Sequence, residues 1–472
     1  MSGRDSRLKR MKHFLSAIVA SCALVVPTFG QQFAHDISLS GLGNGDAKPF
    51  GLAYEPISNQ LYVALSGSFG TPNDVVAVID VATDTVKQVI PVGLYPEDIA
   101  FVYDASGNFR YGAVTNSTSG SVTLWDDQDQ VVATVALPDP WMMGSCYPFG
   151  ITASEDGQFF YITTQDGTGE IYAVNVNTLS VDTTAGLAAP FRSGGRPVHA
   201  NGTLFAPMTT YTATWTGSEA GLGACSSVAT NYTMLHVEDG TSTYPSGQDL
   251  VQLPDGRMVW GGLFADNRLY IFSADGALEQ TVSCSAGAHG LGVNATGDIL
   301  VACGLYGNLL SFIDLNTMKE ISTVSVSNVG LGYSMPNDAV FAGGKLYVTS
   351  QGTEEVMVFD NLPTAGQSNH TGSLVISNPS PSAGEFLDVS VNGQGITALV
   401  SADAAWPTMT SYGFLMDIGP NLRIHGHGIN AFQKTFRVPL SGSIAGTHHW
   451  MQGAQLNAGA WTTTEPRVLV LQ

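Results

Sequence analysis

The chain has 472 residues, of which only 12% are charged and 54 are glycine. Its length exceeds that of a usual single hydrophobic core, and low charge with frequent Gly, Val and Thr is typical of an all-β protein with many tight turns, not of a helical or disordered one. The formal net charge of −21 argues against nucleic acid or anionic lipid as a partner, because an acidic surface repels polyanions.

Residues 1–30 are typical of a secretory signal peptide. The basic stretch RLKRMKH precedes the apolar run FLSAIVASCALVV, and small residues follow near Thr28 and Gly30. A lipoprotein box ending at Cys22 fits less well, because the apolar run continues beyond it. No other segment approaches the ~20 apolar residues that a membrane-spanning helix needs. We therefore expect a secreted, periplasmic or cell-surface protein without a membrane span, which keeps 13 basic and 38 acidic residues after cleavage, a net charge of −25.

One short pattern, an apolar strand, a tight turn and a second strand, recurs along the chain. KPFGLAYEPISNQLYVAL (48–65) and YPFGITASEDGQFFYITT (147–164) match almost position for position. The other copies are YPEDIAFVYDASGNFRYGAVTN (95–116), RPVHANGTLFAPM (196–208), GQDLVQLPDGRMVWGG (247–262), AHGLGVNATGDILVACG (288–304) and PNDAVFAGGKLYVTSQG (336–352). Third and fourth strands usually follow each copy. Four short strands at intervals of 40 to 52 residues are the period of a propeller blade, so the sequence predicts a seven-bladed β-propeller over 31–366.

The segment AHDISLS (34–40) precedes the first blade and has strand-like character. The seventh blade supplies only three clear strands of its own. We expect this segment to dock as the outer strand of the seventh blade, which joins the two ends of the ring and removes an exposed sheet edge.

Several of these stretches resemble a known repeat. NQLYVALS, GAVTNSTSGSVTLWD and KLYVTSQGTEEVMVFD, preceded by PFGLA or PFGIT, are similar to the YVTN-type (NHL/YVTN-like) β-propeller repeats of exported and surface-layer proteins. The resemblance covers about 34–366, and the fourth copy departs from it most. It implies the fold, but such propellers serve as binders, scaffolds and enzymes alike.

A Pro- and Ser-rich stretch at 367–382 predicts a linker. Beyond it, about seven strand-like segments in 383–472 predict a small C-terminal β-sandwich. The pattern FLMDIGPNLRIHGHG followed by FRVPL is similar to C-terminal sandwich modules of exported proteins from planctomycete-type bacteria. That similarity implies an accessory or sorting role.

In a propeller the first strand of each blade lines the axial channel, so the residues at its start meet at the channel mouth. The repeat places there Gly51, Asp98, Gly150, His199, Asp249, His289 and Asp338. Three carboxylates and two imidazoles suit a divalent cation such as calcium or zinc, or acid–base chemistry. Asp98, His199, Asp249, His289 and Asp338 are therefore candidate metal ligands. The alternative is a structural channel lining in which the aspartates cap backbone amides.

Five aromatic residues fall on loops that this topology places on the same face: Trp141, Tyr147, Trp215, Tyr244 and Tyr333. An acidic mouth ringed by flat apolar side chains suits a sugar or another neutral polyol. The aromatic side chains are therefore candidate ligand-binding residues. The alternative is that they pack against the blades beneath them.

Four cysteines remain after cleavage, Cys146, Cys225, Cys284 and Cys303, and they allow three pairings in an oxidising compartment. We expect all four on the mouth face. The pairing we favour is Cys284–Cys303 within the sixth blade and Cys146–Cys225 between neighbouring blades.

Three functions remain open. The first is a non-enzymatic binding scaffold that presents its mouth face to a protein or glycan at the cell surface. The second is a metal-dependent hydrolase or lyase of the lactonase or lyase kind found on related propellers. The third is a structural surface-layer subunit. The chain has no G-x-S-x-G elbow, H-E-x-x-H, Walker loop or dinucleotide fingerprint.

Overall fold

The computed structural model forms two compact units, Gln31–Gln367 and a second that contains Ser368–Gln472, each considered by itself. The described residues are 32–139, 142, 144–165, 170–182, 187–188, 193–211, 218–226, 233–239, 249–261, 267–305, 308–326, 334–360, 362–363, 365, 373–376, 386–402, 408–409, 415–416, 423–437, 448–457, 460–463 and 467–470. The predicted signal peptide lies outside them.

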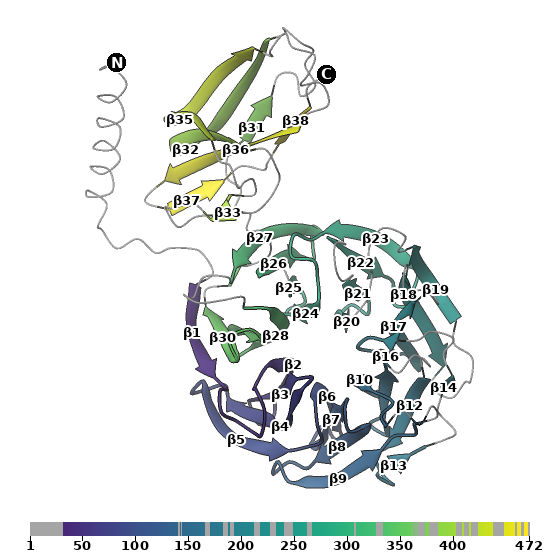
Figure 1. Cartoon of the computed structure of the whole chain (residues 1–472). Helices are drawn as coiled ribbons and strands as arrows, with labels where there is room; N and C mark the ends of the chain where they lie inside the picture. The colour runs from purple at the N-terminus through teal and green to yellow at the C-terminus, as the bar shows by residue number, and fades with distance from the viewer. Residues whose placement is uncertain are drawn as a thin grey trace. The chain divides into compact units, whose positions relative to one another are not determined.

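The first unit is a seven-bladed β-propeller, and its described residues contain strands and no helix (Figure 1). The strands of each blade are given from the axis outward. Blade one contains β2 (Pro49–Glu55), β3 (Gln60–Ser68), β4 (Thr71–Asp80) and β5 (Thr85–Pro91), and blade two contains β6 (Pro96–Tyr103), β7 (Phe109–Asn116), β8 (Ser121–Trp125) and β9 (Val131–Ala136). Blade three contains β10 (Pro148–Ala153), β11 (Phe159–Thr164) and β12 (Glu170–Asn175), and β12 pairs with both β13 (Ser180–Val181) and β14 (Leu187–Ala188).

Blade four differs because two short strands lie innermost and both pair with the second strand. Blade four contains β15 (Ser193–Gly194) and β16 (Val198–Ala200), then β17 (Thr203–Tyr211), β18 (Ser218–Ser226) and β19 (Thr233–Asp239). Blade five contains β20 (Asp249–Gln252), β21 (Met258–Gly261), β22 (Arg268–Phe272) and β23 (Leu278–Ser283), and blade six contains β24 (Gly290–Val293), β25 (Ile299–Gly304), β26 (Leu309–Asp314) and β27 (Lys319–Ser325). Blade seven contains β28 (Pro336–Ala342), β29 (Lys345–Ser350), β30 (Glu355–Asp360) and, outermost, β1 (Gln32–Ser38).

The hydrophobic core lies between the blades. Each neighbouring pair of blades shares a cluster of buried side chains, as expected for sheets that are apolar on both faces. Between blades one and two, Tyr62 stacks on the fully buried Trp125 with ring centroids 5.6 Å apart. Gly112 is required there, since a Cβ atom would come 2.3 Å from the Trp125 ring.

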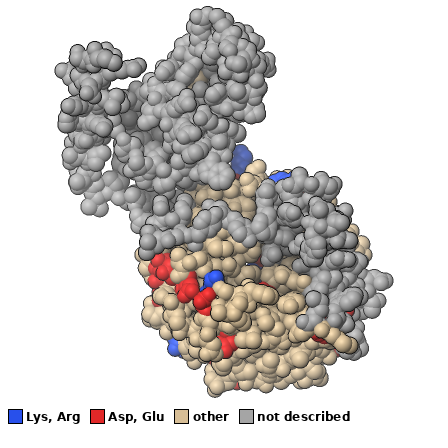
Figure 2. Space-filling view, in the orientation of Figure 1, with Lys and Arg blue, Asp and Glu red and all other residues tan. Residues whose placement is uncertain are grey.

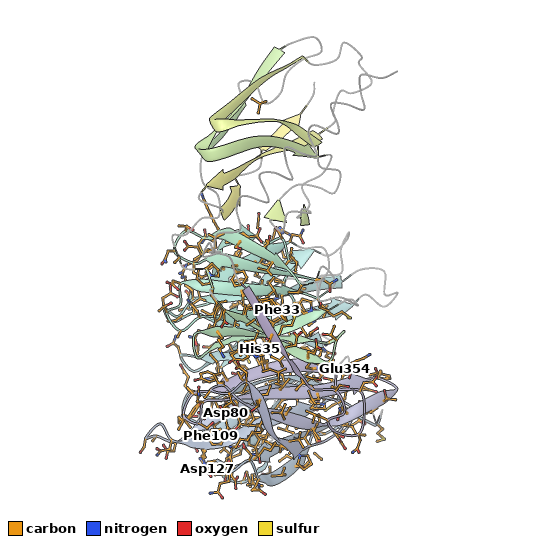
Figure 3. All side chains as sticks on the ribbon, turned by 90° about the vertical axis from the view of Figure 1, so that its left-hand side faces the viewer. Phe33, His35, Asp80, Phe109, Asp127 and Glu354 are labelled. Atoms are coloured by element: carbon orange, nitrogen blue, oxygen red, sulfur yellow. The ribbon has the colours of Figure 1, made fainter. Side chains whose placement is uncertain are left out.

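The predicted closure of the ring is confirmed. Strand β1 pairs antiparallel with β30, with Ile37 opposite Val356. It places Ile37 and Leu39 in the cluster between blades seven and one, where they are 5% and 0% exposed. Phe33 and His35 lie on this strand, which crosses the edge of the propeller in Figure 3. The two ends of the ring are therefore joined by one sheet.

The second unit contains a sheet ordered β31–β32–β36–β37, in which β35 also pairs with β32 and β38 with β36, and a separate β33–β34 pair. The bounds are β31 (Ser373–Ile376), β32 (Phe386–Ala402), β33 (Thr408–Met409), β34 (Leu415–Met416), β35 (Arg423–Arg437), β36 (His448–Asn457), β37 (Ala460–Thr463) and β38 (Arg467–Val470). Strand β31 falls within the range assigned to the linker, and the C-terminal sandwich stays a prediction. A search of the described residues finds no helix with the length and apolar character needed to cross a membrane.

Candidate functional site

Glycines let neighbouring innermost strands approach one another at the axis. A Cβ atom on Gly51 would come 2.1 Å from the Glu97 carbonyl oxygen and 3.1 Å from the Cα of Asp98. Gly290 has the same relation to blade seven, where its Cβ would lie 2.8 Å from the Cα of Asp338. These contacts show which residues of successive blades are equivalent.

Three aspartates join neighbouring blades by one repeated hydrogen bond. Each carboxylate accepts the backbone N–H of the residue that follows the glycine of the next blade. The bonds run from Ile151 N to Asp98 Oδ2 (2.9 Å), from Leu291 N to Asp249 Oδ2 (2.6 Å) and from Leu52 N to Asp338 Oδ2 (2.9 Å). Together with the glycine contacts they define the axial ring, one residue per blade: Gly51, Asp98, Gly150, Arg196, Asp249, Gly290 and Asp338.

A threonine of the second strand supports this ring in blades two, three and seven. Its hydroxyl accepts the N–H of the ring residue of its own blade and donates to a carbonyl of the next blade. The Thr115 hydroxyl accepts Asp98 N–H and donates to the Phe149 carbonyl. In the same way Thr163 accepts Gly150 N–H and donates to the Gly195 carbonyl, and Thr349 accepts Asp338 N–H and donates to the Phe50 carbonyl. All six distances are 2.6–3.1 Å. The threonine of the VTN, ITT and VTS motifs therefore links blades.

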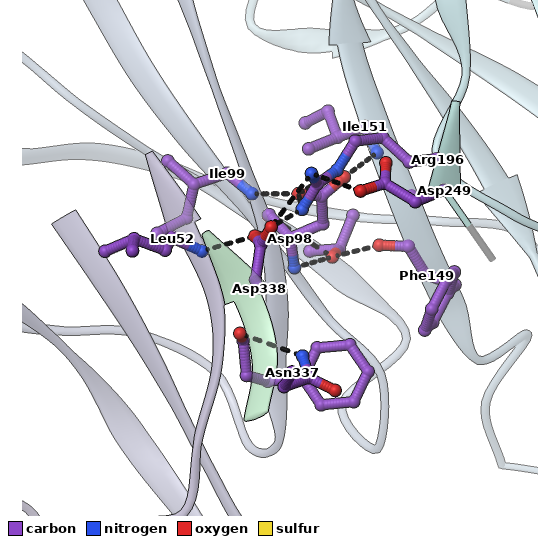
Figure 4. A network of polar contacts seen from close by, with 12 residues as sticks. Leu52, Asp98, Ile99, Phe149, Ile151, Arg196, Asp249, Asn337 and Asp338 are labelled. Atoms are coloured by element: carbon purple, nitrogen blue, oxygen red, sulfur yellow. Dashed lines mark hydrogen bonds and ion pairs between the residues drawn. The ribbon is translucent and has the colours of Figure 1, made fainter. Parts of the chain in front are cut away.

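Arg196 is the ring residue of blade four and lies between β15 and β16. A Cβ atom on Gly150 would come 2.6 Å from its Cα. Its guanidinium pairs with all three ring aspartates (Figure 4). The distances are 3.0 Å from Nε and 2.9 Å from Nη2 to Asp98 Oδ1, 3.2 Å from Nη1 to Asp249 Oδ2, and 2.7 Å from Nη2 to Asp338 Oδ2. Arg196 was not among the residues predicted at the channel mouth.

Burial and charge act in opposite directions in the ring. Burial raises the pKa of Asp98, and it raises the pKa of Asp249 to about 7, while the Arg196 charge opposes both shifts. Burial also lowers the pKa of Arg196, but the charges of Asp249, Asp338 and Asp98 outweigh it and hold that pKa well above its usual value. The guanidinium therefore stays charged and neutralises only part of the carboxylate charge around it.

β-Bulges direct a second layer of side chains over the ring. In blades one, two, three and seven the register shifts between the first proline of the strand and the residue after the ring position. The residue before each of these prolines has a positive φ: Lys48 (34°), Tyr95 (61°), Tyr147 (48°) and Met335 (51°). These left-handed residues set the chain direction at the mouth.

A small pocket of about 20 Å³, enough for about one water molecule, lies above the ring and opens to solvent. Phe50, Phe149, His289 and Asn337 line it together with Arg196 and the ring aspartates. The Phe50 ring meets Phe149 and His289 edge-on, with centroids 5.7 and 6.0 Å apart. Burial lowers the pKa of His289 to about 4, so this imidazole is neutral at pH 7.

The structure brings together three of the five predicted metal ligands, Asp98, Asp249 and Asp338, but it places a guanidinium among them. His289 is adjacent, since Gly290 and not His289 is the ring residue of blade six. His199 is not part of the ring. It stacks on Tyr161 at 5.3 Å, and its Nδ1 accepts the N–H of Glu155 at 3.3 Å.

The misplacement of His199 has a local cause. In blade four the ring residue precedes the proline, at Arg196-Pro197, whereas in blades one, two, three and seven it follows the proline. Within the described part of the chain, no group of three or more His, Cys, Asp or Glu side chains is placed to hold a metal ion.

Only one of the predicted ligand-binding aromatics can be placed. Tyr147 is half-buried in the connection to blade three, and its carbonyl accepts the N–H of Gln165 at 2.9 Å. Trp141, Trp215, Tyr244 and Tyr333 lie outside the described residues. Recognition by these aromatics stays a prediction.

All four cysteines, Cys146, Cys225, Cys284 and Cys303, are buried, and their pairing stays a prediction. Cys146 belongs to the cluster between blades two and three, and Cys225 to the cluster between blades three and four. Cys284 and Cys303 likewise belong to different clusters. The cysteines therefore act as core residues and not as part of the mouth surface.

Comparison with known proteins shows the fold. No protein-family model and no curated protein matches the chain. Among solved structures it is similar to a hydrazine synthase of Kuenenia stuttgartiensis (TM-score 0.53, 15% identity, 70% of this chain and 99% of that one). It is also similar to a virginiamycin B lyase from Staphylococcus aureus (0.52, 11%, 69% and 98%) and to a chain of a mitotic checkpoint complex (0.51, 12%, 71% and 94%). At these identities the likeness is one of architecture.

Proposed function

We propose that this protein is exported and that the mouth face of its propeller binds a partner at the cell surface. The observation that carries the proposal is a contrast between the axis and the loops around it. Both carboxylate oxygens of Asp98 and of Asp338 accept hydrogen bonds within the ring. These carboxylates hold the blades together, which leaves them poorly suited to act as general bases or metal ligands.

The loops of the same face expose large apolar side chains instead. Phe69, in the turn between β3 and β4, is 77% exposed and lies edge-on to Tyr95 at 6.4 Å. Leu94 and Met142, in the connections between blades, are 41% and 92% exposed. Exposed apolar groups with a polar rim are typical of interaction surfaces.

Charge and the amino terminus support the same proposal. Acidic side chains gather on the face shown in Figure 2, where Lys and Arg are few. Such a surface favours a neutral or basic partner. The signal-like segment 1–30 would deliver the propeller to the cell envelope or beyond, where a protein or glycan meets this face.

Site-specific photo-crosslinking tests the proposal. A photoreactive residue replaces Phe69 on the mouth face or, as the matched control, Ile57, which is 59% exposed in the turn between β2 and β3 at the opposite face. We expect fractionation to find the protein outside the cytoplasm and a discrete adduct from position 69 only. Equal labelling from both positions, or a cytoplasmic protein, would contradict the proposal.

A further inference from the structure

Two side chains that line the mouth pocket each have a buried oxygen that accepts no hydrogen bond. The oxygens are Asp249 Oδ1 and Asn337 Oδ1, on side chains that are 3% and 2% exposed, and no described residue donates to either. The other functional atoms of these side chains are used, because Asp249 Oδ2 accepts Leu291 N–H and Asn337 Nδ2 donates to the Phe50 carbonyl. A buried acceptor without a donor costs free energy, so Asp249 Oδ1, at the charged end of the pocket, favours a ligand that donates.

The charge and the walls of the pocket narrow the chemistry of that ligand. Three aspartates face one arginine, which favours a cation over an anion. Phe50 and Phe149 supply aromatic rings at the same pocket, and such rings attract organic cations. Phe149 is 5% exposed whereas Phe50 is half-buried, so Phe50 is the more accessible of the two rings.

Resting on the proposed binding function, we propose that this pocket binds a primary alkylammonium group, which is the head of a free amine or of a lysine side chain. Its N–H groups donate to Asp249 Oδ1, and its alkyl stem lies against the phenyl rings. Calcium suits the pocket less well, because it takes six to eight oxygen ligands and the oxygens of Asp98 and Asp338 are already used.

Titration calorimetry of the full chain with small probes tests this chemistry. The probes are n-butylammonium, the neutral n-butanol and the anionic butyrate, which share an alkyl chain and differ in the head group. We expect binding of n-butylammonium alone. A lysine-containing peptide and its acetyl-lysine counterpart then distinguish the sources: binding of the first peptide and not the second assigns a protein lysine, and binding of only the free amine assigns a small-molecule ligand.

Two variants locate the site. Asp249→Asn removes the unpartnered carboxylate oxygen and should weaken n-butylammonium binding at least about 10-fold, since hydrogen bonds to charged groups are the strong ones. Asp98→Asn is the matched comparison: it removes one of the three carboxylate charges and perturbs the same arginine, but both oxygens of Asp98 already accept, so the loss of affinity should be smaller than in Asp249→Asn. Phe50→Leu should lower affinity about two- to fivefold.

The pH dependence adds a readout that a structural role would not move. Asp249 faces Arg196, Asp98, Asp338 and the Leu291 N–H, and its pKa is raised to about 7 mainly by burial. His289 stays neutral above about pH 4, and an alkylammonium stays charged up to about pH 10. Affinity should therefore rise between pH 6 and 8 as Asp249 ionises, and the rise should be absent in Asp249→Asn.

Several results would overturn the inference. They are equal binding of n-butanol and n-butylammonium, no binding of either, or an equal loss of affinity in Asp249→Asn and Asp98→Asn. This outcome can be separated from that of the proposed function. A crosslink from position 69 without ammonium binding would support the mouth as an interaction face and contradict the ammonium site. Ammonium binding without the crosslink would support the ammonium site and contradict the interaction face.

Discussion

Charged groups join distant segments of the chain at two places, the axis and the rim. At the axis one cation, Arg196, pairs with three carboxylates. At the rim, where blade seven meets blade one, one carboxylate, Asp84, receives Lys345 Nζ at 2.5 Å, the Tyr347 hydroxyl at 2.6 Å and His35 Nε2 at 3.2 Å. The first cluster has more acceptors than its cation can satisfy, and the second has more donors.

This difference separates a cluster that only stabilises the ring from one that could also bind a ligand. The rim cluster is satisfied and partly exposed, with Lys345 and His35 side chains 28% and 44% exposed, so it closes the ring and offers no buried site. The axial cluster is buried and keeps one carboxylate oxygen of Asp249 without a donor. Of these two clusters, the axial one therefore combines a structural role with a carboxylate oxygen that lacks a donor.

The largest effect should come from opening the rim. Deletion of residues 31–46 removes β1 and the buried side chains of Ile37 and Leu39, each worth about 1.5–3 kcal/mol. We expect the free energy of unfolding, measured by urea denaturation, to fall by about 3–6 kcal/mol. Ser40→Ala, at an exposed position of the same segment, is the control and should change little. A melt that is unchanged by the deletion would show that the ring closes without this strand.

Removal of the axial cation should cost almost as much. Arg196→Leu leaves three buried carboxylates without their counter-ion, and breaking such a buried cluster costs about 3–5 kcal/mol. The loss should grow as the pH rises, because the aspartates then become charged without a partner. Arg257→Leu, which breaks an exposed pair with Asp255, is the control and should cost at most about 1 kcal/mol. Equal stability of the two variants would refute the structural role of the axial ring.

Much of the fold could be predicted because each blade repeats the same local chemistry. Copies such as 95–116 and 147–164 carry the strands, turns and threonines whose contacts recur from blade to blade, so periodicity alone gave seven blades. The closing strand followed from the same logic, because blade seven lacked an outer strand. The cysteine pairing stays a prediction, because strand pattern does not show which face of a sheet buries a thiol.

The site could be predicted only in part. Asp98, Asp249 and Asp338 occupy regular positions and were found. Arg196 lies in the most divergent copy and precedes its proline, whereas the ring residues of blades one, two, three and seven follow theirs. A signal existed: three aspartates that converge at one axis need a counter-charge, and Arg196 is a rare cation directly before a predicted innermost strand. Whether a metal ion or a guanidinium lies among the aspartates depends on which residue of blade four is at the ring position. A single sequence does not define that register to one residue.

A smaller loss of stability should follow from replacing either of two tyrosines that occupy equivalent positions in blades one and seven. The Tyr347 hydroxyl donates to Asp84 across the closure, and the equivalent Tyr62 hydroxyl donates to Asp129 between blades one and two at 2.7 Å. Each Tyr→Phe variant loses a hydrogen bond to a carboxylate, worth about 1.5–3 kcal/mol. We expect Tyr347→Phe to cost less than Tyr62→Phe, because Lys345 still neutralises Asp84. A larger loss of stability in Tyr347→Phe than in Tyr62→Phe, measured by thermal unfolding, would mean that the Tyr347 hydroxyl and not Lys345 is the main partner of Asp84.

The smallest effect concerns Asp36 on β1, which lies beside the rim cluster. Burial and the nearby Glu355 raise the pKa of Asp36 to about 6, and His35 opposes this shift. A raised pKa means that the folded state prefers the protonated carboxyl, so its contribution to stability is present below about pH 4 and is lost as the pH rises through about 6. Asp36→Asn should therefore be more stable than the parent chain at pH 7 and similar to it at pH 4 in urea titrations at both values. Asp127→Asn, at an exposed turn position, should show no such difference, and a destabilised Asp36→Asn at pH 7 would show that the carboxylate supports the closure instead of opposing it.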